Sequence, residues 1–270
     1  MIELIQIFII AIAQGITEFL PISSSGHNAV INHLFTLSEH PLTEDSSEFV
    51  KLNILLHVGS LIAILVVFRK RVLDLLGTNR RLIPMLIVAT IPAVAVGLPI
   101  HKFAPWLQEY LPLIAGCFVV TGILLLLTLR IAEGEKSCST MTWKDALIIG
   151  CVQAVAILPG ISRSGSTIVA GLFCRLKREE SAAFSFLLAI PVIAGSGLLE
   201  CYSMMKSGGT EPSASAISDG LLLFGAFISC VTGILALVFL LDWLKKGKLW
   251  YFAIWVFVMV PITLALLMIS

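Results

Sequence analysis

The stretch "TEFLPISSSGH", residues 17 to 27, sets a carboxylate, a proline, three serines, a glycine and a histidine inside an otherwise apolar chain. A second stretch, "LPGISRSGST" at residues 158 to 167, repeats this pattern and adds an arginine. Pro21 and Pro159 are expected to end the helices that enter these stretches. Short Ser/Gly turns follow, and new helices are expected to begin near Asn28 and Thr167. Each stretch is therefore predicted to form a helix, a turn and a second helix.

The composition around these stretches is that of a membrane protein. Of the 270 residues, 58% are hydrophobic and 13% are charged, whereas a soluble domain carries about 25% charged residues. Six apolar runs approach or exceed the roughly 20 residues that a helix needs to cross a bilayer. They are 52–68, 82–100, 112–129, 183–199, 220–241 and 249–269. A net charge of +1 gives no reason to expect a nucleic-acid partner.

The basic residues predict how such a chain is oriented. If the two polar segments return to the side that they entered from, one set of loops holds 14 of the 18 basic residues and the other set holds three. Because cytoplasmic loops are enriched in Lys and Arg, the first set is predicted to be cytoplasmic, with both termini outside. The 14 residues are Arg69, Lys70, Arg71, Arg80, Arg81, Arg130, Lys136, Lys144, Arg175, Lys177, Arg178, Lys245, Lys246 and Lys248.

The two polar stretches also mark an internal repeat. When the chain is shifted by 139 residues, the pairs that coincide are Gln14 with Gln153, Ile22 with Ile161, Ser23 with Ser162, Ser25 with Ser164, Gly26 with Gly165 and Val30 with Val169. Each repeat, 1–135 and 136–270, would hold one re-entrant segment (1–36 or 143–175) and three spans. An odd number of spans inverts the second repeat. The predicted fold is an all-α polytopic membrane protein with six transmembrane helices and two re-entrant helix–loop segments in an inverted-topology repeat.

Two such tips meeting at mid-membrane form a candidate anion site. The N-terminus of a helix binds phosphate through free N–H groups, and Arg163 adds a planar, bidentate donor. A charged side chain at this depth costs at least about 2.5–3.5 kcal/mol, which a bound anion would offset. Two facing tips suit a diphosphate. The alternative is that Arg163 pairs with Glu18 for structural reasons alone.

The remaining polar residues of the stretches suggest phosphoryl transfer. Glu18 is the candidate base or metal ligand, and Gln14 lies one helical turn before it. Ser24 and His27 are the candidate nucleophile and proton carrier, while Ser23 and Ser25 either bind substrate or cap the following helix. The incomplete neutralisation of a diphosphate predicts a divalent cation, Mg²⁺ or Ca²⁺, held by Glu18 with or without Gln14. Asn53 and His57, four residues apart, either line the same cavity or pack.

The stretches "QGITEFLPISSSGH" and "LPGISRSGSTI" resemble the two signature motifs of the undecaprenyl-diphosphate phosphatases of the BacA/UppP type. The first motif is Glu/Gln-x-x-x-Glu followed by P-x-S-S-x-G-H, and the second is P-G-x-S-R-S-x-x-T. The residues at the motif positions are Gln14, Glu18, Ser24, His27, Ser162, Arg163, Ser164 and Thr167. Gln14 stands where some members of the family carry Glu.

The resemblance implies that the chain removes the terminal phosphate of undecaprenyl diphosphate, a polyprenyl diphosphate lipid, in the bacterial plasma membrane. It also implies recycling of the lipid carrier for cell-wall synthesis, bacitracin resistance, a divalent cation and a site that opens to the outer face. The residue types leave the nucleophile open among Ser24, His27 and water. The main alternative is a lipid-phosphate flippase or anion transporter with the same mid-membrane site, and a purely structural membrane partner is a weaker one. The sequence does not decide whether the chain forms a homodimer.

Overall fold

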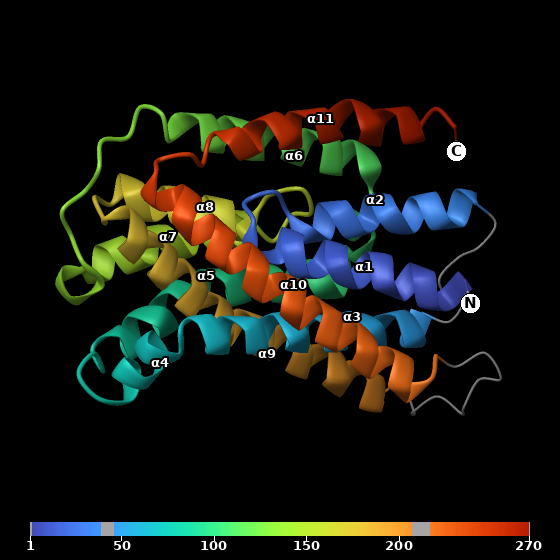
Figure 1. The fold of residues 1–270 in the computed structure, drawn as a ribbon, viewed down its shortest axis with the longest axis horizontal. Helices are drawn as coiled ribbons and strands as arrows, with labels where there is room; N and C mark the ends of the chain where they lie inside the picture. Colours follow the sequence, from blue (N-terminus) through green and yellow to red (C-terminus); the bar gives the residue numbers. More distant parts are fainter. Residues whose placement is uncertain (1, 39–45, 207–216, 270) are drawn as a thin grey trace.

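The computed structural model describes residues 2–38, 46–206 and 217–269, and these form helices joined by short connections (Figure 1). The described residues contain no strand beyond one isolated bridge between Lys136 and Leu176. The helices are α1 (Ile2–Phe19), α2 (Ser24–Leu37), α3 (Ser46–Val67), α4 (Arg69–Leu76), α5 (Leu82–Phe103), η1 (Pro105–Gln108), α6 (Leu111–Leu127), η2 (Cys138–Thr140), α7 (Trp143–Val155), α8 (Arg163–Phe173), α9 (Arg178–Lys206), α10 (Asp219–Lys245) and α11 (Tyr251–Leu266).

Five of the described helices, namely α1, α3, α5, α9 and α10, are long and apolar enough to cross a membrane. Four of the six predicted spans lie in this group, and α1 is its fifth member. The predicted spans 112–129 and 249–269 fall on α6 and α11, which have only 17 and 16 residues. A polytopic all-helical membrane protein is thus confirmed. The count of six spans with two re-entrant segments stays a prediction.

The surface of the long helices fits a lipid environment. Large apolar side chains stand exposed along α5 and α10, among them Ile87, Ile91, Phe227 and Leu235, each more than half exposed. Exposed apolar surface of this extent is rare on soluble monomers and marks contact with other apolar matter. Here the hydrocarbon of the bilayer supplies that contact.

Two helix pairs, α1–α2 and α7–α8, approach the centre of the molecule from opposite ends and meet there (Figure 1). Their breaks, residues 20–23 and 156–162, contain Pro21 and Pro159 as the sequence predicts. The second helices begin at Ser24 and Arg163, earlier than expected. The reason is capping, because the Oγ atoms of Ser23 and Ser162 accept hydrogen bonds from the N–H groups of Gly26 and Gly165.

The long helices hold these two pairs in place from both sides. α1 packs along α10 and α7 packs along α5, while α6 lies against α11 and α3 against α9. Phe19, at the end of α1, is fully buried and meets Phe186 of α9 edge-on with ring centroids 5.9 Å apart. Burying such a ring contributes about 1.5–3 kcal/mol, and the aromatic pair adds about 0.5–1.5 kcal/mol. The turn after α1 is therefore anchored directly beside Glu18.

Candidate active site

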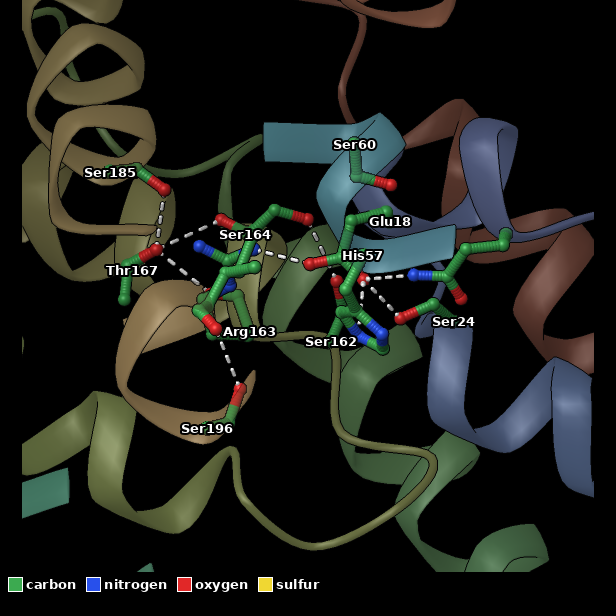
Figure 2. A network of polar contacts seen from close by, with 12 residues as sticks. Glu18, Ser24, His57, Ser60, Ser162, Arg163, Ser164, Thr167, Ser185 and Ser196 are labelled. Atoms are coloured by element: carbon green, nitrogen blue, oxygen red, sulfur yellow. Dashed lines mark hydrogen bonds and ion pairs between the residues drawn. The ribbon is translucent and has the colours of Figure 1, made fainter. Parts of the chain in front are cut away.

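Glu18, in the last turn of α1, is the centre of a polar cluster that joins the two tips (Figure 2). Its Oε1 accepts a hydrogen bond from Arg163 Nη2 at 2.6 Å. Its Oε2 accepts hydrogen bonds from Ser24 Oγ at 2.6 Å and from Gln14 Nε2 at 3.2 Å. Asn28 completes the cluster by donating to Gln14 Oε1 at 2.7 Å. Residues from both motifs are thus brought together, as predicted.

The pairing of Arg163 with Glu18 leaves part of the guanidinium unused. Both side chains are largely buried, and removing one partner of such a pair typically costs about 3–5 kcal/mol. The second terminal nitrogen, Arg163 Nη1, is buried and has no hydrogen-bond partner among the described residues. A buried donor without a partner is costly, and an anion is its natural acceptor. The structural pairing and an anion-binding role are therefore compatible.

The two tips touch through backbone as well as through this ion pair. Ser23 Oγ accepts from Gly160 N–H at 3.1 Å, which links the turn after α1 to the turn after α7. Ser23 itself has a φ of 73°, a conformation that costs a residue with a side chain about 1–3 kcal/mol. Three hydrogen bonds hold it there, since its carbonyl oxygen lies 2.8 Å from His27 Nδ1 and its Oγ also caps α2. Ser25 lies beside it, with its Oγ 3.3 Å from Ser23 Oγ.

Three hydroxyl groups of the second tip, those of Ser162, Ser164 and Thr167, form hydrogen bonds within the protein. Ser162 caps α8, and its Oγ lies 3.2 Å from Ser164 Oγ, which donates to the carbonyl oxygen of Leu20. Thr167 Oγ1 donates to the carbonyl oxygen of Arg163 and lies 2.6 Å from Ser185 Oγ. These contacts hold Arg163 in place from behind. The predicted binding roles of Ser162, Ser164 and Thr167 stay predictions.

Thr121 of α6 connects the second tip to the rest of the fold. Its hydroxyl donates to the carbonyl oxygen of Gly160 at 2.8 Å and accepts from Ser162 N–H at 3.1 Å. The sequence does not predict this contact. A threonine within an apolar run usually bonds to a carbonyl oxygen of its own helix, so its presence gives no sign of a partner elsewhere.

Thr121→Val should lower the thermal unfolding temperature in detergent well below that of Thr121→Ser. Valine keeps the shape but leaves two buried backbone groups without partners, at a cost of about 1–3 kcal/mol each. Serine keeps the hydroxyl and loses only a methyl group, worth about 0.8 kcal/mol. Equal unfolding temperatures for the two variants would mean that this hydroxyl does not support the tip.

His27 is packed differently from the other predicted site residues. Its Nδ1 bonds to the carbonyl oxygen of Ser23, and its Nε2 accepts from the indole N–H of Trp255 at 2.9 Å. The ring stacks on Trp255 and meets Phe118 edge-on. In this geometry His27 holds the Ser23 turn against α6 and α11. A catalytic role would require one of the two hydrogen bonds to break, and it stays a prediction.

A cavity of about 850 Å³ adjoins the cluster. Gln14, Ser24 and Ser25 lie along it, together with Asn53 and His57 of α3, which the sequence left open between lining and packing. The cavity extends to Glu109 and Glu200, near the ends of η1 and α9. Its size is within the usual range for small-molecule sites. A ligand that enters here would meet Ser24 and the Glu18 cluster.

Glu18 and Gln14, the predicted ligands of a divalent cation, both have hydrogen-bond partners within the protein. The described residues contain no group of three or more His, Cys, Asp or Glu side chains that could hold one. Glu18 is the single carboxylate of the cluster, and both of its oxygens already accept hydrogen bonds. Gln14 Oε1 is likewise bonded to Asn28. Mg²⁺ is usually held by one or two carboxylates together with substrate phosphates, so the divalent cation expected at Glu18, with or without Gln14, stays a prediction.

Fold and site together define a multi-pass membrane protein with a buried ion pair and a polar cluster between two helix–turn–helix tips. The chain belongs to the BacA family, described as bacitracin resistance protein BacA, whose model matches residues 7–262. It is 41% identical over 94% of its length to an undecaprenyl-diphosphatase of Rhodopirellula baltica, of which 94% is covered. It is also 38% identical to undecaprenyl-diphosphatase 4 of Bacillus thuringiensis strain Al Hakam, over 93% of each chain. A Carboxydothermus hydrogenoformans undecaprenyl-diphosphatase is 37% identical, over 94% of each chain.

Proposed function

We propose that the chain hydrolyses undecaprenyl diphosphate to undecaprenyl phosphate and inorganic phosphate. The observation that carries the proposal is the cluster of Arg163, Glu18 and Ser24, whose buried Arg163 Nη1 lacks a partner among the described residues. The family match and the relatives that are named undecaprenyl-diphosphatase agree with it. The enzyme would thereby return the lipid carrier to cell-wall synthesis and confer bacitracin resistance.

Arg163 would hold the diphosphate, and Ser24 or a water molecule would attack the terminal phosphorus. The new bond joins the attacking oxygen to that phosphorus, while the bond from phosphorus to the bridging oxygen breaks and its electrons stay on the lipid phosphate. Glu18 orients Ser24 by accepting its hydrogen bond at 2.6 Å. Attack by His27 is disfavoured, since both of its ring nitrogens are engaged. Ser23, Ser162, Ser164 and Thr167 would shape the tips around the phosphates.

We assign the cavity mouth to the outer, periplasmic side of the plasma membrane. The ends of α2, α5 and α9 near the mouth lie at the same end of the molecule as the start of α1 and the end of α11 (Figure 1). The basic helix α4 lies at the opposite end. The positive-inside rule then favours outer termini and an outward-facing site. The isoprenoid tail of the substrate would lie in lipid between the helices.

An inverted repeat would account for this arrangement. Each half of the chain contributes one broken helix pair and three further long or apolar helices, which are α3, α5 and α6 in 1–135 and α9, α10 and α11 in 136–270. The packing partners correspond, because α1 on α10 mirrors α7 on α5. We therefore propose that α1–α2 and α7–α8 are the two re-entrant segments, related by a pseudo-twofold axis through the tips. We also propose that a divalent cation, Mg²⁺ or Ca²⁺, would be held by Glu18 together with the phosphate oxygens.

The test is phosphate release from undecaprenyl or farnesyl diphosphate by the purified protein in detergent with Mg²⁺. We expect activity in the wild type, and a loss of about a hundredfold or more in Glu18→Gln, because the carboxylate that binds Arg163 and orients Ser24 is gone. Glu133→Gln, at an exposed position, is the matched control. A wild type that binds the lipid but releases no phosphate would support the lipid-phosphate flippase or anion transporter instead.

A further inference from the structure

The proposed hydrolysis needs a group that accepts a proton from the attacking hydroxyl. No residue of the Glu18 cluster is a suitable proton acceptor. Arg163 carries no lone pair that could accept it. Glu18 is paired with that guanidinium, and three donors already bond to its two oxygens. Both ring nitrogens of His27 already have hydrogen-bond partners, Nδ1 in the carbonyl oxygen of Ser23 and Nε2 in the indole N–H of Trp255.

His57 of α3 places a ring nitrogen beside the same carboxylate. Its Nδ1 lies 2.8 Å from the carbonyl oxygen of Asn53, which can only accept, so Nδ1 carries the hydrogen and Nε2 keeps its lone pair. Nε2 lies 4.0 Å from Glu18 Oε2, the oxygen that accepts the hydroxyl of Ser24 (Figure 2). The His57 side chain is 28% exposed and lines the cavity. His57 therefore adjoins the carboxylate that binds Ser24, and it lines the same cavity as Ser24.

The position of His57 relative to Glu18 is set by backbone contacts. α1 and α3 both pack on α10 through glycines, at Gly15 just before Glu18 and at Gly59 just after His57. A Cβ on Gly15 would lie 2.5 Å from the carbonyl oxygen of Ser229, and one on Gly59 would lie 2.2 Å from that of Ala226. Contacts this close leave the helices little freedom to slide. The two side chains are consequently preorganised, as a catalytic pair must be.

His57 lies between the Glu18 cluster and the cavity. Its Nε2 is 4.0 Å from Glu18 Oε2, and its side chain lines the cavity, as Glu200 of α9 does. The same cavity carries the proton onward to water.

We propose that His57 is the proton acceptor of the hydrolysis, a role that rests on the proposed function. As the oxygen of Ser24 or water bonds to the terminal phosphorus, its proton moves to His57 Nε2. The bond between that phosphorus and the bridging oxygen breaks, and its electron pair leaves with the lipid phosphate. The proton on Nε2 then passes to water in the cavity. If Ser24 is the nucleophile, the same nitrogen accepts the proton of the water that later releases phosphate from the serine.

His57→Ala tests this role, because alanine opens space in the cavity for a small added base. We expect kcat for phosphate release to fall about a hundredfold or more while KM changes less than threefold, since proton transfer of this kind contributes about 10²–10⁴-fold to a rate. Imidazole in the assay buffer should restore kcat at least tenfold in His57→Ala and should leave the wild type unchanged. Glu133→Gln, at an exposed position outside this cavity, is again the control. His57→Gln keeps the size of the side chain and should lose kcat without rescue.

Each outcome separates this role from the function on which it rests. A wild type that releases no phosphate overturns the proposed function and the role together. An active wild type whose His57 variants keep kcat, or lose only KM, overturns the role alone. The same holds if imidazole fails to restore a well-folded His57→Ala. If the alanine variant does not fold, the kcat of His57→Gln decides.

Discussion

Replacing Arg163 by lysine is expected to reduce kcat/KM for phosphate release by about 10²–10³-fold, although the positive charge is kept. Arg163 uses one terminal nitrogen, Nη2, to bond Glu18, and its second terminal nitrogen is buried without a partner among the described residues. A guanidinium presents both donors in a fixed plane, so it can bind carboxylate and phosphate at once. A lysine ammonium at the same place is a single point charge, so it could not bind the carboxylate and the phosphate in the same fixed geometry. A hundredfold loss corresponds to about 2.7 kcal/mol of transition-state stabilisation.

The control for this substitution is Arg69→Lys at the start of α4, where the side chain is exposed and donates to the carbonyl oxygen of Val66 in α3. It should keep the wild-type rate. The unfolding temperature must be measured in parallel. If lysine at position 163 pairs less well with Glu18, the buried charges also destabilise the fold. A folded Arg163→Lys with activity within threefold of the wild type would show that the unpaired Nη1 does not bind the phosphates.

The two tips could be predicted from the sequence because their residue types are out of place in a bilayer. Proline, a run of serines, glycine and a buried arginine each carry a cost at mid-membrane, and together they mark the breaks after α1 and α7. The pairing of Arg163 with Glu18 was expected only as the alternative to anion binding, and the structure shows it. The starts of α2 and α8 were placed late, because Ser23 and Ser162 act as caps and the helices include the residues directly after them.

Contacts across helices could not be read from the chain. Thr121 and Trp255 lie in apolar runs whose hydropathy says nothing about which neighbour they face, yet one bonds the Gly160 turn and the other bonds His27. The set of long apolar helices also differs from the six predicted spans, because it includes α1, which was predicted to be re-entrant. α1 has 18 residues and a high mean hydropathy, so it can span by length, and length alone does not separate a re-entrant helix from a crossing one.

His27 and His57 also show that the sequence does not reveal contacts between helices. His27 adjoins Ser24 in sequence and was expected to carry protons, whereas His57 was only expected to line the cavity or pack. In the fold, a helix turns His27 away toward α6 and α11, and α3 brings His57 to Glu18 from a distant part of the chain. Motif spacing therefore identified the site but not every side chain that faces it.

Gly160→Ala is expected to lower the unfolding temperature and to reduce phosphate release more than tenfold, because this glycine is where the two tips and α6 come closest. Its φ is 93°, which an alanine adopts at a cost of about 1–3 kcal/mol. Its Cβ would also lie 2.5 Å from the carbonyl oxygen of Ile114, a backbone atom that cannot move aside easily. Overpacking of this kind adds about 1–3 kcal/mol. The turn would have to shift, and Arg163, three residues later, would shift with it.

Gly116→Ala on α6 is the matched control, since a Cβ there meets nothing within 4 Å. Alanine within a helix is favoured over glycine by about 0.5–1 kcal/mol, so this variant should unfold at the same or a slightly higher temperature. Comparing the two variants by thermal unfolding in detergent and by phosphate release separates strain at the tip from a general intolerance of added methyl groups. If Gly160→Ala matched Gly116→Ala in both measurements, the two tips would not be in the close contact on which the alignment of Arg163 with Glu18 and Ser24 depends.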